Sequence, residues 1–293
     1  MIHKIANGLL SAAASEQGAE LWSLRGADGV EYLWQGDQAY WRDRGIHLFP
    51  YVARLTDKSY YLDGALYHME IHGLAPYQRF RAVEVRAERM VFELTDSPET
   101  YRGYPRRFAF RVIYRLLGQT LEITYEVENR DSRTMYFGLG GHPGFHVPLT
   151  PGLIFSDYRL RFSEPCRPIR VGFTPECFLS GADSIYPLVD DRILPLEHSL
   201  FDDDAVVLKN AARSVTLEAE GEGRSVTVSC PRMPYLGLWH TPGTDAPYLC
   251  IEPWTSLPSH QGKITVFESQ RDLRSLCPGG CYRNVWTITI AEK

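Results

Sequence analysis

The stretch FAFRVIYRLLGQTLEITYEVEN, residues 108–129, decides the fold of this chain. Apolar residues recur at every second position in two runs within it, at 108–114 and again at 121–127. Successive side chains of a β-strand point to opposite faces, so a period of two predicts a strand with one buried face. Gly118 and Gln119 separate the two runs and predict the turn of an antiparallel hairpin.

Other segments of the chain repeat this alternation. Residues 215–219 and 226–228 alternate on either side of a loop that contains glycine, and residues 286–290 alternate near the C-terminus. Residues 1–18 are interpreted as a strand and a turn, because polar residues and glycine interrupt the apolar run that a signal peptide needs. No apolar stripe with helical spacing runs for about ten residues or more, which predicts few, short, peripheral helices. The fold prediction is therefore all-β, built from antiparallel sheets.

Composition supports a sheet protein and excludes several other classes. The chain has 293 residues, of which 44% are hydrophobic and 23% charged, as in ordinary globular proteins. Its 24 glycines, 19 prolines and 12% aromatic residues favour sheets and turns over helices, whose interiors reject glycine and proline. No linker, low-complexity tract or repeat divides the sequence, so residues 1–293 are predicted to form a single domain. Residues 151–204 alternate more weakly and are expected to form a long surface connection.

Charge and cysteine content narrow the range of partners and compartments. The net charge is −5 and no basic run occurs, so a nucleic-acid partner is not expected. No segment approaches the ~20 consecutive apolar residues of a membrane-spanning helix, so a membrane partner is not expected either. Six cysteines are too few for a disulfide scaffold in a chain of this size, which favours free thiols and a cytoplasmic location. The CPGGC segment at 277–281 is interpreted as a loop with incidental thiols.

Side chains capable of acid–base chemistry or ligand binding gather in four segments, each expected at a strand end. These segments are LFPYVARL with Arg54, YHMEIHG with His72, GGHPGFHVP with His142, and YLCIEPW with Glu252. For each segment, the neighbouring residues in the sequence indicate whether the side chain has a chemical or a structural role.

The segment YHMEIHG at 67–73 predicts a strand with His68, Glu70 and His72 on one face. Imidazole and carboxylate groups bind zinc, iron and manganese, so these three side chains form a candidate metal site. The favoured interpretation is an exposed polar face with His72 at its end.

The segment GGHPGFHVP cannot form a helix, because Pro143 and its neighbouring glycines interrupt one. The spacing of its two histidines is therefore not that of the helical zinc-protease motif. Gly140 and Gly141 allow a close backbone approach or a positive φ, and we expect His142 to be held at a strand-to-loop junction. Both a catalytic role and a packed histidine beside Phe145 stay open at this point.

Glu252 follows the apolar run 248–251, which predicts a buried central strand. A carboxylate in such a strand is costly unless it is paired or functional. Burial against Trp254 would raise its pKa towards the range of a general base. A salt bridge to an arginine such as Arg54 is the structural alternative.

These segments, in this order, resemble the aldose 1-epimerase (galactose mutarotase-like) superfamily, and in particular its less characterised bacterial branch. HGLAP at 72–76, GGHPGF at 140–145 and CIEPW at 250–254 carry the resemblance, with LFPYVARL upstream. GAELWSL, YPRRFAFRVIY, FDDDAVVL and YLGLW extend it over nearly the whole chain. The resemblance implies a supersandwich of two large antiparallel sheets, with an open groove on one face and no requirement for a metal or another cofactor.

The resemblance also implies roles for individual side chains. His142 would be the general acid at the sugar ring oxygen, and Glu252 would be the general base at the anomeric hydroxyl. His72 and Arg54 would hold hydroxyl groups of the sugar. A carboxylate paired with an imidazole can remove one proton and supply another near neutral pH, as the opening of a hemiacetal ring requires.

The chain departs from the better-known galactose mutarotases at two places. They carry HPYF where this chain has HPGF, and the candidate here for their groove aspartate is Asp204. Galactose specificity therefore stays open. Trp239 is expected to line the groove, and Tyr77, Phe145 and Trp254 are further aromatic candidates for the apolar face of a sugar.

The predicted function is that of an aldose 1-epimerase, which interconverts the α and β anomers of a hexose by acid–base ring opening. Two alternatives share the same groove: a carbohydrate-binding protein without turnover, and a hexose-6-phosphate 1-epimerase. A third alternative is a metal-dependent enzyme that would use His68, Glu70 and His72. The expected partner is a small sugar substrate, no cofactor is expected, and a homodimer is a possible assembly.

Overall fold

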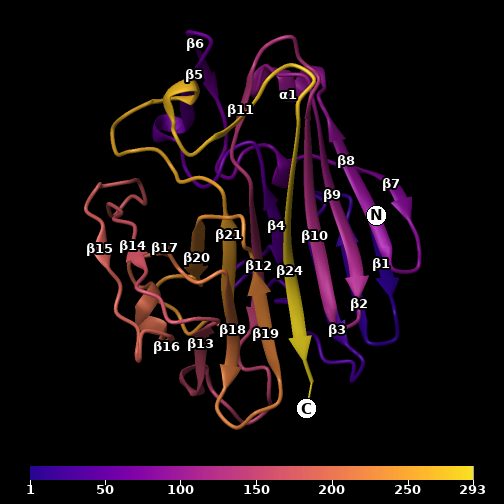
Figure 1. The fold of residues 1–293 in the computed structure, drawn as a ribbon, viewed down its shortest axis with the longest axis vertical. Coiled ribbons are helices and arrows are strands. Elements are labelled where there is room, and N and C mark those ends of the chain that lie inside the picture. Colours follow the sequence, from indigo (N-terminus) through magenta and orange to yellow (C-terminus); the bar gives the residue numbers. More distant parts are fainter. Residues whose placement is uncertain (293) are drawn as a thin grey trace.

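Strands form most of the regular structure of the chain (Figure 1). The computed structural model describes residues 1–292, and the one α-helix in this range, α1, spans the six residues Pro98–Gly103. Short 3-10 helices lie at Thr56–Lys58, Ala75–Tyr77, Phe155–Asp157, His198–Phe201 and Phe267–Ser269. The prediction of an all-β chain with few, short helices is confirmed.

Two large sheets hold most of the strands and form the two layers of the fold. The nine-stranded sheet has the order β16 (Ile193–Pro195), β13 (Tyr158–Phe162), β18 (Ser214–Ala219), β19 (Ser225–Ser229), β24 (Cys281–Ala291), β10 (Thr120–Asn129), β9 (Phe108–Leu117), β8 (Arg89–Thr95) and β7 (Arg81–Val85). The seven-stranded sheet has the order β15 (Ser184–Ile185), β14 (Ile169–Arg170), β17 (Val206–Lys209), β20 (Tyr235–Trp239), β21 (Tyr248–Trp254), β12 (Gly140–His146) and β4 (Gly45–Leu48). Neighbouring strands in both sheets are antiparallel.

Three smaller sheets complete the structure. One consists of β1 (Ile2–Ala6), β2 (Leu10–Ser15) and β3 (Leu21–Gly26), and a second of β22 (Thr265–Val266), β5 (Ser59–Leu62) and β6 (Ala65–His68). The third pairs β11 (Met135–Phe137) with β23 (Arg274–Leu276). The pairing of β22 with β5 is parallel.

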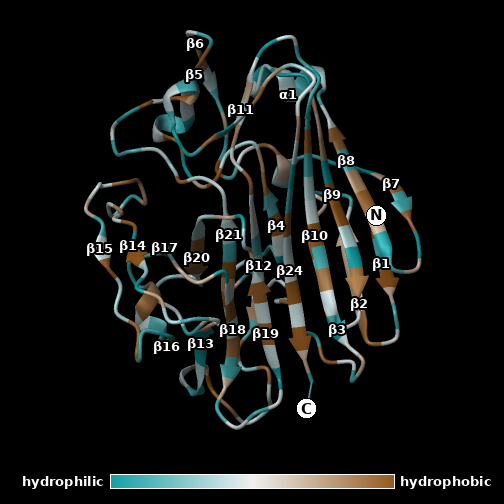
Figure 2. Ribbon diagram, in the orientation of Figure 1, coloured by the Kyte–Doolittle hydropathy of each residue, from teal (hydrophilic) through white to brown (hydrophobic). Residues whose placement is uncertain are grey.

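The hairpin predicted at 108–129 forms as β9 and β10, and Gly118 takes the positive φ of 60° in its tight turn. One face of the hairpin is apolar, and Leu121 and Ile123 on it are fully buried. The opposite face carries charge, with Glu122 lying 3.5 Å from Arg115 on the neighbouring strand. Figure 2 shows the resulting hydrophilic and hydrophobic bands along these strands. The apolar face is therefore the one available to pack against the second sheet.

The seven-stranded sheet packs on this buried face. The Tyr125 hydroxyl of β10 donates a hydrogen bond to the Gly140 carbonyl of β12 at 3.1 Å, and it lies 2.7 Å from Nδ1 of His47 on β4. Apolar side chains from both sheets, among them Ile251 of β21 and Trp286 of β24, belong to one continuous core. The hydroxyl and the imidazole are tolerated at the centre of this core because they pair with each other.

Most local predictions are confirmed. The N-terminal strand and turn form as β1 and β2, the second hairpin forms as β18 and β19, and the C-terminal strand forms as β24. The prediction that 151–204 is only a surface connection is wrong in part, because β13 within it belongs to the nine-stranded sheet. That strand has five residues, so its alternation is too short to stand out from the loops around it.

All six cysteines are free thiols, as the sequence indicated. Cys277 is exposed in the loop before β24, and Cys281 is the exposed first residue of that strand. Among the helices of the described residues, none has the length and apolar character needed to cross a membrane.

Replacing Ile123 with alanine tests the assignment of the buried face. Its side chain is 0% exposed, so the loss of transfer energy and the cavity left behind should lower the free energy of unfolding by about 2–5 kcal/mol. Glu126→Ala on the opposite face of β10 is the control and should change it by no more than about 0.5 kcal/mol. Urea unfolding measures both. Equal effects of the two substitutions would contradict the assignment.

Candidate functional site

A cavity of about 620 Å³ opens where the seven-stranded sheet meets several loops. Strands β4, β12, β20 and β21 supply one side of its lining, and loops supply the rest. All six site residues predicted from the sequence line this cavity: Arg54, His72, His142, Asp204, Trp239 and Glu252.

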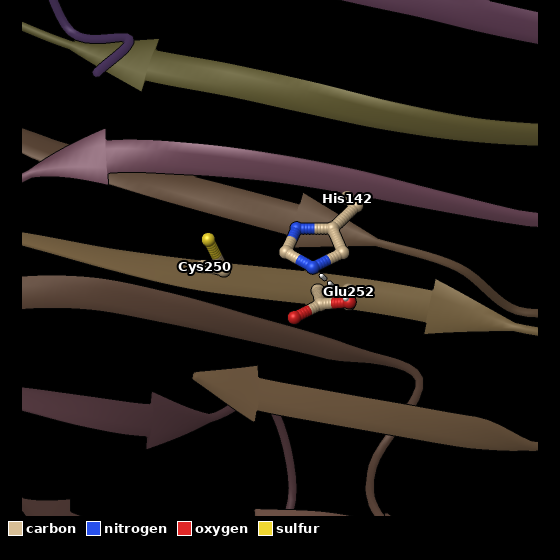
Figure 3. A group of neighbouring side chains, drawn as sticks. All are labelled: His142, Cys250 and Glu252. Carbon is tan, nitrogen blue, oxygen red and sulfur yellow. Dashed lines mark ion pairs between the residues drawn. The ribbon is translucent and has the colours of Figure 1, made fainter. Parts of the chain in front are cut away.

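His142 and Glu252 form the centre of the site. The register between β12 and β21, which pairs Gly140 with Trp254 and Gly144 with Cys250, places these two residues opposite each other. Nε2 of His142 lies 3.2 Å from Oε2 of Glu252 (Figure 3). The titratable side chain in contact with Glu252 is therefore a histidine rather than Arg54, which lies near Asp204 instead.

The prediction that His142 lies at a strand-to-loop junction is wrong, because β12 runs through Gly140–His146 and the histidine is inside it. Glu252 is likewise inside β21 rather than at its end. Pro143 is tolerated in a central strand because the pairing of β12 with β21 is interrupted between Gly140 and Gly144, where a proline without an N–H loses little.

The glycines of GGHPG leave room for three indole rings. A Cβ at Gly141 would lie 2.5 Å from the ring of Trp286 in the opposite sheet, which no real side chain permits. On the other face, a Cβ at Gly140 would lie 2.8 Å from Trp254, and one at Gly144 would lie 3.1 Å from Trp41. The expected close approach at Gly140 and Gly141 is therefore confirmed. At each of the three glycines, an indole ring occupies the space that a side chain would need.

Burial determines the charge state of the central pair. Desolvation raises the pKa of Glu252 well above its usual range. Desolvation, assisted by His72, lowers the pKa of His142 well below its usual range. Both shifts oppose charge: a second proton would charge the histidine, and loss of the last proton would charge the carboxylate. Burial therefore favours the state in which the two groups hold one acid–base proton between them.

The central pair also has polar atoms without partners. The 3.2 Å contact between Nε2 of His142 and Oε2 of Glu252 lacks hydrogen-bond alignment, so Oε2 is buried without a hydrogen bond within residues 1–292. Nδ1, the other nitrogen of the ring, is buried without one as well. Leaving such an atom unsatisfied typically costs about 1–3 kcal/mol. A polar ligand that reached these atoms would relieve this cost.

His72 is held by its own loop. Its backbone has a φ of 66°, that of Ala53 has a φ of 58°, and the N–H of His72 donates to the Ala53 carbonyl at 3.0 Å. The Ala53 N–H in turn donates to Nδ1 of His72 at 3.3 Å. Burial, with a contribution from Arg54, lowers the pKa of His72 to about 3. The neutral ring therefore carries its proton on Nε2, as a donor.

The alternative metal site at His68, Glu70 and His72 does not form, and His68 and Glu70 are exposed, as the favoured interpretation had it. Strand β6 ends at His68, so the three residues do not share one strand face. Nδ1 of His68 lies 2.9 Å from the Ser59 hydroxyl, and Glu70 pairs with Lys58 on the surface. Gly73 and the positive φ of His72 turn the chain before the alternation can continue.

Asp204 is joined to two neighbours in the cavity. The Cys177 thiol donates to Oδ2 of Asp204 at 2.6 Å, and Nη2 of Arg54 lies 4.0 Å from the same oxygen. Cys177 and Asp204 both have positive φ values, 65° and 76°. Burial, reinforced by Asp204, raises the pKa of Cys177 to about 12, so this group stays a protonated donor.

Aromatic rings surround His142. Trp41 lies over it with ring centroids 4.8 Å apart and planes tilted by 31°, and Trp239 contacts it edge-on at 5.7 Å. Tyr77 and Trp254 also line the cavity. Phe145 does not, since it is fully buried in the main core, which corrects the prediction that it could face a sugar.

Sequence reasoning missed Trp41, Glu20 and Asp43, which line the cavity as well. Trp41 and Asp43 lie in the irregular segment between β3 and β4, and Glu20 immediately precedes β3. Trp41 and Asp43 belong to no alternating run and to none of the segments that carry the resemblance, whereas Glu20 belongs to GAELWSL, for which no site residue was predicted. Distant neighbours bring all three to the cavity, and no local pattern identifies them as lining residues.

Within residues 1–292, the central pair and Cys250 form the one cluster of three histidine, cysteine or carboxylate side chains close enough together to hold a metal. His142, Cys250 and Glu252 offer one nitrogen, one sulfur and one oxygen within 4.8 Å of one another (Figure 3). Such donors suit zinc. Burial raises the pKa of Cys250 well above its usual range, so this thiol would have to lose a proton to bind a metal. A metal held here would block the acid–base pair.

Nearly the whole length of the chain is similar to known proteins. The sequence pattern of the aldose 1-epimerase family matches residues 1–283. The chromosomal and plasmid LacX proteins of Lactococcus lactis subsp. lactis are each 30% identical to this chain over 304 residues, and the match covers 99% of this chain and 99% of theirs.

Solved structures of galactose mutarotase-like proteins are also similar to this chain over nearly its whole length. A galactose mutarotase related enzyme from Lactobacillus acidophilus has a TM-score of 0.95 and 29% identity, covering 100% of this chain and 98% of its own. A galactose mutarotase-like protein from Lactobacillus casei has a TM-score of 0.92 and 30% identity, covering 99% of this chain and 100% of its own. The predicted galactose mutarotase-like fold is confirmed, and the chain belongs to the aldose 1-epimerase family.

Proposed function

We propose that this protein is an aldose 1-epimerase that interconverts the α and β anomers of a free hexose. The contact between His142 and Glu252 carries the proposal, because it sets an acid and a base side by side in the lining of a sugar-sized cavity. General acid–base catalysis needs both groups within reach of the atoms between which protons move.

The two groups divide the work of ring opening. Glu252 takes the proton from the anomeric hydroxyl O1, the C1–O5 bond breaks as C1=O1 forms, and His142 gives a proton to O5. Rotation about C1–C2 then turns the other face of the aldehyde towards O5. Reclosure returns the proton on O5 to His142 and the proton on Glu252 to O1, so both groups end as they began.

The single proton shared by the pair suits this cycle. Each direction of the reaction needs one group that holds a proton and one that accepts a proton, which is the condition of a singly protonated pair. Nε2 of His142 and Oε2 of Glu252 lie 3.2 Å apart without hydrogen-bond alignment, so the bound sugar has to align the two side chains before the proton moves from one to the other. The working state, with His142 protonated and Glu252 ionised, is then stabilised by the sugar oxygens.

Other lining residues would hold the sugar. The Nε2 proton of His72 and the Arg54 guanidinium are donors for ring or hydroxyl oxygens. Trp41 and Trp239 offer apolar ring surface to the C–H face of the sugar. His72 would act here as a neutral donor, since its low pKa prevents it from competing as an acid.

Charge favours a free hexose over a hexose 6-phosphate. Five carboxyl groups line the cavity, and Arg54 is the one Lys or Arg side chain in the lining: the five are Glu20, Asp43, Asp203, Asp204 and Glu252. A phosphate group adds roughly −1.5 to −2 charges at neutral pH. Bringing it among the ionised members of this set would be repulsive, whereas neutral hydroxyl groups would find many acceptors.

Polarimetry on freshly dissolved α-glucose and α-galactose tests the function. The protein should accelerate the decay of optical rotation for at least one of them, and it should act much more slowly on the 6-phosphates. The activity should survive EDTA, because the proposed proton transfers need no Lewis acid. Binding without acceleration across a panel of sugars would favour the carbohydrate-binding alternative, and activity lost on chelation and restored by a metal would favour a metal enzyme.

Glu252→Gln separates catalysis from stability. Loss of the base should lower kcat by about 10²–10⁴-fold, with sugar binding weakened much less. Glutamine imitates the protonated carboxyl that burial favours, so the melting temperature should not fall. Glu122→Gln on the nine-stranded sheet is the control and should leave both quantities unchanged. A destabilised but fully active Glu252→Gln variant would end the general-base assignment.

The protonation state of His72 can be read by NMR of protein labelled with ¹⁵N in its histidine rings. The ring should stay neutral, with its proton on Nε2, between about pH 5 and about pH 8, since burial holds its pKa near 3 instead of the ordinary ~6.5. A His72→Asn variant identifies the signal. A His72 resonance that titrates near its ordinary pKa would show that this ring is hydrated and charged at mildly acidic pH.

A further inference from the structure

Among the carboxyl groups that line the cavity, Glu20 is the most buried one that the mechanism above leaves without a role. It directly precedes β3, its side chain lines the cavity, and the residue is only 7% exposed. A carboxyl group this buried is costly unless something binds it. Its hydrogen bonds show which of its two oxygens is already satisfied.

The protein binds one of the two oxygens. Oε1 of Glu20 accepts hydrogen bonds from the backbone N–H of Arg44 at 2.6 Å and of Gly45 at 3.3 Å. None of the hydrogen bonds within residues 1–292 uses Oε2. The Arg44 guanidinium does not serve it either, because that group lies over Trp22 and donates to Gln35 and to the Trp22 carbonyl.

A second carboxyl group lies close by. Asp43 lines the same cavity, and burial, with a smaller contribution from the charge of Asp43, raises the pKa of Glu20 to about 7. When ionised, Oε2 of Glu20 and the carboxyl group of Asp43 are hydrogen-bond acceptors only. A ligand that satisfies them has to present hydrogen-bond donors without negative charge.

We infer that Glu20 determines specificity in the proposed reaction: its Oε2 accepts a hydrogen bond from one hydroxyl group of the hexose bound at His142 and Glu252. This inference rests on the proposed function for the position of the sugar. An ionised carboxylate is an acceptor only, so it selects a hydroxyl and rejects a position where the hydroxyl is missing or replaced by an anion.

The competing explanation is purely structural. By binding the two backbone N–H groups, Oε1 holds the segment that carries Trp41 and Asp43. Glu20→Gln distinguishes the two explanations, because the amide oxygen keeps the bonds of Oε1 while an NH₂ group replaces Oε2. Glu20→Ala removes both. Glu31→Gln is the matched control, since Glu31 also accepts two backbone N–H bonds, from Leu24 and Leu33, outside the cavity.

The experiment measures binding of d-glucose, d-galactose and their monodeoxy derivatives by calorimetry at about pH 8, where Glu20 is mostly ionised. Glu20→Gln should weaken binding of the parent hexose about tenfold or more, the usual effect of losing a hydrogen bond to a charged group. For one monodeoxy hexose the wild type should already show this loss, and Glu20→Gln should add little to it. Glu31→Gln should bind like the wild type.

Two results would overturn the inference. Wild-type binding in Glu20→Gln with impaired binding in Glu20→Ala would leave Glu20 a structural role only. An equal loss with every monodeoxy hexose would show that no single hydroxyl is bound. If the protein binds sugars but does not accelerate mutarotation, the proposed function is wrong, and the Glu20 test can still be carried out. If the protein accelerates mutarotation and Glu20→Gln binds sugars like the wild type, only the inference about Glu20 is wrong.

Discussion

The site depends on how closely the backbone of β12 approaches the opposite sheet at Gly141. A Cβ there would lie 2.5 Å from the ring of Trp286, so the two sheets can meet at this distance only with glycine in that position. Because side chains alternate along a strand, contact of Gly141 with the core sends His142 to the other face, into the cavity. The same register sets His142 opposite Glu252. A larger residue at 141 would push β12 outward and alter the distance between the acid and the base.

The lining of the cavity is organised before any ligand binds. Four of its residues, Ala53, His72, Cys177 and Asp204, hold positive φ values that are unfavourable for side chains with a Cβ. Their surroundings maintain this backbone, as the reciprocal bonds between Ala53 and His72 do. Strain and unpartnered buried atoms both lower stability, and both occur where the sugar is proposed to bind. The strain lowers the free energy of unfolding, and it holds the polar groups in position before a ligand binds.

The sequence predicts most of the fold because the hairpin at 108–129 and its counterparts depend on a local period of two. It predicts the six site residues through short motifs, each of which the structure brings to the same cavity. It fails where distant contacts override a local rule. Pro143 looks like the end of a strand, yet it lies inside β12 because the ladder is interrupted beside it. Glu20 and Trp41 reach the cavity only through tertiary packing, and no window of sequence records that.

The departure from the HPYF pattern of the better-known galactose mutarotases has a physical explanation in this chain. At the third position of HPGF stands Gly144, and the space of its missing side chain is filled by Trp41, whose ring would lie 3.1 Å from a Cβ there. A tyrosine at 144 would collide with this indole. Trp41 is held in turn by its backbone carbonyl, which accepts the Trp34 indole N–H at 2.9 Å and the Asp37 N–H at 3.0 Å. The aromatic wall beside His142 therefore comes from the segment before β4 instead of from β12. Glu20 also binds that segment through the backbone N–H groups of Arg44 and Gly45. The same carboxyl group therefore contributes acidic character to the lining and holds the segment that shapes the cavity near His142.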